Sequence, residues 1–133
     1  MSISKITGDL AAGKTTARQH LETCLEAIDS EDGRRAFITV NSDAARAEAD
    51  RVDAMRAAGA TLPPFAGVTL SVKDLFDIAG EITRAGSRVL DGAAPAARDC
   101  SVVARLRAAG FNIIGRTNIC LLYTSDAADE GGS

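Results

Sequence analysis

The chain has 133 residues, enough for one domain at most, and carries 15 Lys and Arg against 18 Asp and Glu. Setting aside the three acidic residues of 120–133, a segment without Lys or Arg, leaves 15 charges of each sign. A neutral body without a basic stripe argues against nucleic acid as a partner.

The three cysteines, Cys24, Cys100 and Cys120, are widely spaced and form no C-x-x-C pair. This spacing argues against a disulfide framework and against a zinc site. No apolar run approaches 18 residues and no signal peptide is recognisable. We therefore expect no membrane partner and a cytoplasmic protein.

The first helix is predicted by a capping box. Thr16 and Gln19 have the required spacing, and apolar residues then recur at helical intervals, which predicts a helix over 17–29. Asp32-Gly33 is expected to break it. The only histidine, His20, is expected on the polar side of this helix, so Ser-His-Asp and Cys-His catalysis have little support.

A strand and a second helix are expected next. Aromatic and β-branched residues predict a strand over 36–40. Asn41 or Ser42 can cap a helix that ends with Gly59 as its C′ residue.

A strand is predicted over 68–72, where apolar and polar residues alternate. Alternation places Val68, Leu70 and Val72 on one face, and Thr69, Ser71 and Lys73 on the other.

The remaining elements complete an α/β pattern. Residues 80–95 are expected to form loops, and Asp99 or Ser101 to cap a third helix that ends at Gly110. A strand over 111–115 follows. Strand, helix and strand within this length favour a mixed sheet flanked by helices, with some parallel pairing.

Residues 8–15 spell G-x-x-x-x-G-K-T, the phosphate-binding P-loop pattern. That loop requires a buried strand before its first glycine, and residues 1–7 are too polar to supply one. A P-loop nucleotide-binding protein is thus the less favoured alternative, from a different class of protein. Thermal stabilisation of the chain by a nucleotide would distinguish it.

The strongest chemical signal is Lys73, which ends an apolar run and precedes Asp74 and Asp77. Lysine acts as a base only when neutral, and its ordinary pKa of about 10.4 must then fall by several units, as burial can achieve. Read without further context, Lys73 is a surface lysine paired with one of the two aspartates. Those aspartates are best interpreted as local turn and capping groups rather than as a carboxylate pair.

Three stretches resemble the amidase signature family. Residues 67–80 are similar to its motif GVPISVKDLFDVAG, residues 83–87 to TTAGS, and residues 99–118 to D.pvVarLraaGAviiGrTN. In that family the lysine of the first motif is the base of a Ser–cis-Ser–Lys triad, so the resemblance assigns the catalytic role to Lys73. Ser87 matches a family position, but it receives no triad role.

The resemblance implies the N-terminal part of an amidase-signature fold. It implies a hydrolase that cleaves a small-molecule carboxamide to a carboxylic acid and ammonia or an amine, without metal or organic cofactor, in an enzyme that can be a homodimer. The alternative within the family is the A subunit of a tRNA-dependent amidotransferase, which releases ammonia from glutamine with the same triad.

The resemblance ends at about Asn118 or Ile119. Residues 120–130 look like a translated sequencing adapter, and the closing Gly-Gly-Ser lacks the rest of the family's GGSSGG stretch. We therefore predict that 1–119 is the N-terminal portion of a truncated amidase domain and 120–133 a non-native tail. Both triad serines would lie in the missing C-terminal part, so this chain alone is expected to be inactive.

Overall fold

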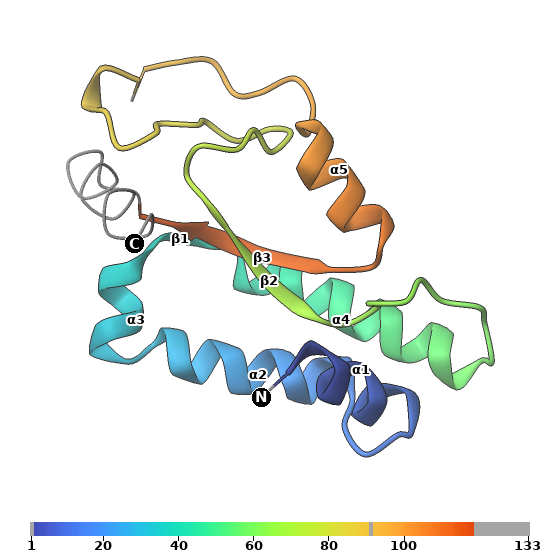
Figure 1. Ribbon diagram of the computed structural model, residues 1–133. Coiled ribbons are helices and arrows are strands. Elements are labelled where there is room, and N and C mark those ends of the chain that lie inside the picture. The colour runs from blue at the N-terminus through green and yellow to red at the C-terminus, as the bar shows by residue number, and fades with distance from the viewer. Residues whose placement is uncertain (1, 91, 119–133) are drawn as a thin grey trace, which may run out of the picture.

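A computed structural model describes residues 2–90 and 92–118 of the chain. Its centre is a mixed three-stranded sheet in the order β1-β3-β2, formed by β1 (Phe37–Val40), β2 (Thr69–Lys73) and β3 (Asn112–Thr117) (Figure 1). β1 runs antiparallel to β3 and β2 runs parallel to it. The mixed sheet with parallel pairing is therefore confirmed, whereas the tail predicted at 120–133 lies outside the described residues.

Helices cover both faces of this sheet. They are α1 (Ile3–Ala11), α2 (Ala17–Ile28), α3 (Glu31–Ala36), α4 (Ser42–Ala57) and α5 (Ser101–Ala108), with a 3₁₀ turn η1 (Arg88–Leu90). Figure 1 shows α2 and α4 on one side of the sheet, and α5 with the long segment after β2 on the other. No helix among the described residues is long and apolar enough to cross a membrane.

Each face of the sheet has its own hydrophobic cluster. The first includes Leu21 of α2, Val52 of α4 and Ile114 of β3. The second, smaller cluster joins Val72 of β2 to Val103 of α5. The sheet is thus sandwiched between apolar layers, as the α/β pattern requires.

The predicted capping box at the start of α2 is confirmed. Thr16 Oγ1 accepts from the Gln19 amide, and the Gln19 side chain accepts from the Thr16 amide, each at 3.0 Å. The carboxylate of Asp53 on α4 adds a second cap, because it accepts from the amides of Ala17 and Arg18 at 2.8 and 3.0 Å. These bonds satisfy the free amides of the first turn and fix α2 to α4.

The break predicted at Asp32-Gly33 is wrong in position. α2 ends at Ile28, and Asp32 and Gly33 lie inside the short helix α3. Ser30 caps α3 by accepting from the Gly33 amide at 3.1 Å. Glu31 and Asp32 in the first turn suit the positive end of the helix dipole, so local capping overrides the turn signal.

Glycine ends two helices as predicted. Gly59 after α4 has φ +77° and Gly110 after α5 has φ +105°. The amides of Gly110 and Phe111 donate to Arg107 and Leu106, which is the Schellman pattern. A Cβ at Gly110 would lie 2.6 Å from the Ala66 nitrogen, so the turn needs glycine for space as well as for φ.

The P-loop alternative is contradicted by the fold of residues 8–15. Gly8 lies within α1, so no strand precedes the pattern. Gly13 has φ +73° and ends α1 with the same Schellman bonds, because its amide donates to Leu10 and the Lys14 amide to Asp9. These amides are engaged in ending a helix rather than gathered into a phosphate cradle.

Two strand and cap predictions need correction. β2 begins at Thr69, and Val68 packs in the first cluster whereas Val72 packs in the second, because Val68 still belongs to the turn that contains Gly67 at φ +90°. Neither Asp99 nor Ser101 caps α5. Its N-cap is Cys100, because the Asp99 carboxylate instead accepts from the Ala79 amide and pairs with Arg107.

Gly110, at positive φ after α5, and Gly8, inside α1, are expected to respond in opposite ways to substitution by alanine. Gly110→Ala should destabilise the chain by more than about 1 kcal/mol, because it combines positive φ with a backbone clash. Gly8→Ala is the control: a Cβ there meets no atom within 4 Å, and the change should stabilise α1 by about 0.5–1 kcal/mol. Urea unfolding of both variants measures the difference, and equal destabilisation by the two would contradict the assignment.

Candidate functional site

Lys73 is the last residue of β2 and pairs in register with Thr117, at the end of β3. Because the two strands are parallel, their carboxyl ends meet at one edge of the sheet. Asn118 follows there, and its amide donates to the Ala36 carbonyl at 2.7 Å. In open α/β sheets this edge is where ligands usually bind, which agrees with a functional role for Lys73.

The burial expected for Lys73 is not observed. Its side chain is exposed, and no ion pair of Lys73 occurs within the described residues. α2 reaches the amino end of β2, where His20 meets Thr69, whereas Lys73 lies four residues further along, roughly 13 Å at the rise of a strand. The surface-pair alternative is equally unsupported, because neither Asp74 nor Asp77 bonds to Lys73.

Asp74 is a buried partner of β3 rather than a surface turn group. Its side chain is 0% exposed, and its Oδ1 lies 3.3 Å from Nη1 of Arg116, which is 1% exposed. Arg116 also donates from Nη1 to the Phe76 carbonyl at 2.9 Å and from Nε to Glu81 Oε1 at 3.0 Å. Its Oδ1 also accepts from the Arg84 amide at 3.4 Å, so Asp74 does bond the loop after β2 as a turn group, but from a buried position and with its charge paired to β3.

Asp77 does act locally. Its Oδ1 accepts from the Thr83 hydroxyl at 2.7 Å, and its carbonyl accepts from the Cys100 amide at 2.9 Å. Thr83 belongs to the stretch that resembles TTAGS, so this bond joins two of the three similar stretches. The prediction of a local role for Asp77 is confirmed.

A bulge in β3 turns Arg116 toward this loop. Leu70 pairs with Ile113 and Ser71 with Gly115, so β3 holds one extra residue, Ile114. Ile113 packs in the second cluster, and the extra residue returns Arg116, three positions later, to the same face. Gly115 permits the close approach of β1, since a Cβ there would lie 2.2 Å from the Thr39 oxygen.

Sequence reasoning missed Arg116 and Glu81 as parts of this site. Arg116 lies 42 positions after Asp74, and no local pattern joins residues so far apart. A glycine inside a strand is a signal for a bulge or a close backbone approach, and Gly115 carried that signal.

His20 and Cys24 also come together, but not as a catalytic pair. His20 Nε2 lies 4.0 Å from Cys24 Sγ and accepts from the Thr69 amide at 3.2 Å. His20 is therefore half-buried between α2 and β2, not on the polar side as predicted. Burial raises the pKa of the Cys24 thiol, which disfavours the reactive thiolate.

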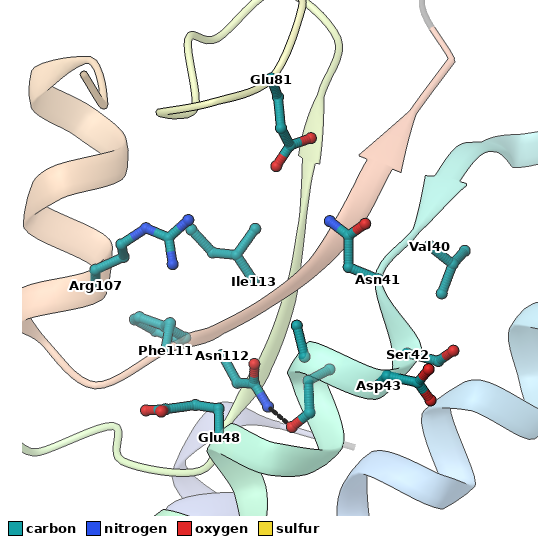
Figure 2. A pocket seen from close by; sticks show the side chains of 12 residues that line it. Val40, Asn41, Ser42, Asp43, Glu48, Glu81, Arg107, Phe111, Asn112 and Ile113 are labelled. Carbon is teal, nitrogen blue, oxygen red and sulfur yellow. Dashed lines mark hydrogen bonds between the residues drawn. The ribbon is translucent and has the colours of Figure 1, made fainter. Parts of the chain in front are cut away.

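A cavity of about 730 Å³ lies away from Lys73. Figure 2 shows Asn41, just before α4, on one side of it, with Arg107 of α5 and Ile113 of β3 on the other. Asn112 closes one side by donating to the Ala45 carbonyl at 2.9 Å. The cavity sits at the amino end of β3, and Lys73 does not line it, although Glu81, the partner of Arg116, does. In the described part of the chain, no group of three or more His, Cys, Asp or Glu could hold a metal ion.

Fold and site together define an α/β sheet protein with a lysine at the carboxyl end of a parallel strand. The family model described as Amidase matches residues 19–130, so this chain belongs to the amidase family.

The relatives are of more than one kind. The chain is 42% identical over 120 residues to AtzE, the 1-carboxybiuret hydrolase component of Pseudomonas sp. (strain ADP), covering 90% of this chain and 26% of the relative. It is 41% identical to the A subunit of the glutamyl-tRNA(Gln) amidotransferase of Salinispora arenicola (strain CNS-205), with 90% and 24% covered. The chain thus spans about a quarter of the length of the curated relatives it matches.

The fold is shared as well. The native peptide amidase of Stenotrophomonas maltophilia superposes with a TM-score of 0.78 at 32% identity, over 90% of this chain and 25% of that one. The fold class and family predicted from the sequence are therefore confirmed.

His20 predicts a pH-dependent stability. Burial lowers the pKa of His20, so folding favours the neutral ring that accepts from Thr69. The stability from this group is present above the unfolded pKa of about 6.5 and is lost as pH falls toward the lower folded value. His20→Gln retains a hydrogen-bond acceptor that does not titrate. The urea midpoint of unfolding should therefore fall less between pH 7.5 and pH 5.0 in this variant than in the wild type.

Glu22 does not disturb this comparison. Hydrogen bonds from Arg46 and Arg18 hold the pKa of Glu22 at about 2, so its contribution to stability is lost only as pH falls below the ordinary glutamate pKa of about 4.3, under the range from pH 7.5 to 5.0. Equal loss of stability in wild type and His20→Gln would contradict the role assigned to His20.

Proposed function

We propose that this chain supplies the lysine-bearing part of an amidase-signature hydrolase. The enzyme cleaves the C–N bond of a small-molecule carboxamide to give a carboxylic acid and ammonia or an amine. The observation that carries the proposal is Lys73: it stands in the family's lysine motif and at the strand edge where α/β proteins bind ligands.

In the mechanism that the family resemblance implies, Lys73 acts as the base. Its neutral amine takes a proton from the cis-serine, which takes the proton of the nucleophilic serine as that oxygen attacks the amide carbon. Backbone amides stabilise the oxyanion of the tetrahedral intermediate, and the proton then passes to the leaving amine. Water releases the acid from the acyl-enzyme by the reverse proton path.

A second candidate is the A subunit of a tRNA-dependent amidotransferase. It is favoured by the 41% identity to a relative that is named as the A subunit of a glutamyl-tRNA(Gln) amidotransferase. Ammonia release from glutamine, but not from other carboxamides, by the longest protein that the gene encodes would support it.

A cytoplasmic location and a homodimer belong to the proposal too. The free thiols of Cys24 and Cys100 are in keeping with a reducing compartment.

Replacing Lys73 in a hybrid enzyme tests the catalytic role. Residues 2–118 would replace the matched segment of the Pseudomonas 1-carboxybiuret hydrolase component AtzE, and hydrolysis would be followed by ammonia release. Lys73→Ala and Lys73→Arg should each lower kcat by about 10²–10⁴-fold, because arginine keeps the charge but cannot give up its proton.

Lys5→Ala is the matched control, since Lys5 is an exposed lysine paired with Asp9 on α1. It should leave kcat unchanged. An active Lys73→Arg hybrid, or a hybrid that folds by circular dichroism but hydrolyses nothing, would refute the assignment of Lys73.

A further inference from the structure

The residue after Lys73 is held by a buried ion pair. Asp74 and Arg116 are 0% and 1% exposed, and their closest charged atoms are 3.3 Å apart. Removing two charges from water costs several kcal/mol per ion, so a buried pair is weak evidence for stability and better attested as a device that fixes one arrangement. Oδ2 of Asp74 and Nη2 of Arg116 have no hydrogen-bond partner in the part of the chain that the structure describes, so the pair is not optimised for stability.

The pair joins three segments at one point. The Asp74 amide donates to the Thr117 carbonyl at 3.1 Å, which extends the β2–β3 pairing one residue beyond Lys73. The Asp74 carbonyl accepts from the Ala85 amide at 2.8 Å, which closes the loop after β2. Arg116 reaches Phe76 and Glu81 of the same loop. The main chain on both sides of Asp74 is therefore fixed.

The side chain of Lys73 makes no bond within this arrangement in the described part of the chain. The side chain is exposed and has no ion pair among the described residues, so the position of Lys73 depends on its backbone: the register with Thr117, the Phe76 amide that donates to its carbonyl at 3.3 Å, and the bonds of its neighbour Asp74. A base must be placed within a fraction of an ångström, and an error of 1 Å can cost about a hundredfold in rate.

We propose that Asp74 and Arg116 are positioning residues, which fix the end of β2 so that the Lys73 amine is held where the proton is transferred. This proposal rests on the proposed function of Lys73. Neither residue exchanges a proton with substrate in this scheme. Each acts through Lys73.

The first test uses the full 133-residue chain and needs no activity. Asp74→Asn keeps the shape of the side chain but removes its charge. Amide hydrogen exchange at position 74 and at Ala85 should become faster by about tenfold or more, relative to the Leu21 amide on the far side of the sheet. Arg116→Lys, which lacks the fork that reaches several partners, should behave alike.

Arg46→Gln is the matched control. It breaks the 2.7 Å ion pair between α4 and Glu22 of α2, remote from Lys73, and should leave the relative exchange of Ala85 unchanged. Unchanged exchange at position 74 and Ala85 in Asp74→Asn would overturn the proposal.

The second test is a double-mutant cycle in the hybrid enzyme. Asp74→Asn should lower kcat by about a hundredfold with little change in KM, and should have no further effect when Lys73 is already alanine. A full kcat in Asp74→Asn, or an equal loss in the Lys73→Ala background, would overturn the positioning role. If Lys73→Ala itself keeps activity, the proposed function fails, while the exchange experiment still decides whether the pair fixes the strand end.

Discussion

The parallel pairing of β2 with β3 is the constraint on which the rest of the structure depends. It brings Lys73 next to Thr117 although 44 positions separate them in the sequence. The pairing also requires a crossover on one face, which α5 supplies, while α2 and α4 cover the other face (Figure 1). Both apolar clusters are consequences of this layering, because each helix buries its apolar stripe against the strand faces.

The bulge at Ile114 changes what this pairing can position. In a regular strand Ile113 and Arg116 would face opposite sides, and the guanidinium would enter the layer packed by α2 and α4. With the extra residue, Arg116 instead turns to the segment after β2, where Asp74 and Glu81 supply carboxylates. The one extra residue thus lets the buried guanidinium of Arg116 reach two carboxylates, instead of entering an apolar layer.

Local chemistry explains which features the sequence could predict. The capping box at Thr16 and the C′ glycine at Gly110 were predictable because each depends on residues a few positions apart. The family motif predicted Lys73 at a strand end. The pairing of Asp74 with Arg116 could not be predicted, because it depends on strand register and a bulge, and α3 was missed because capping by Ser30 outweighed the turn signal of Asp32-Gly33.

The role of a base that we propose for Lys73 has two structural requirements. The backbone must be placed accurately, and the amine must be neutral, which proteins achieve by burial. The described residues meet the first requirement, because the strand pair and the buried ion pair fix the residues around Lys73. They leave its side chain exposed, so they do not supply the burial that the second requirement needs. The proposal therefore assigns to the described residues the placement of the backbone alone, and substitutions at Asp74 should disturb that placement without changing the exposure of the Lys73 side chain.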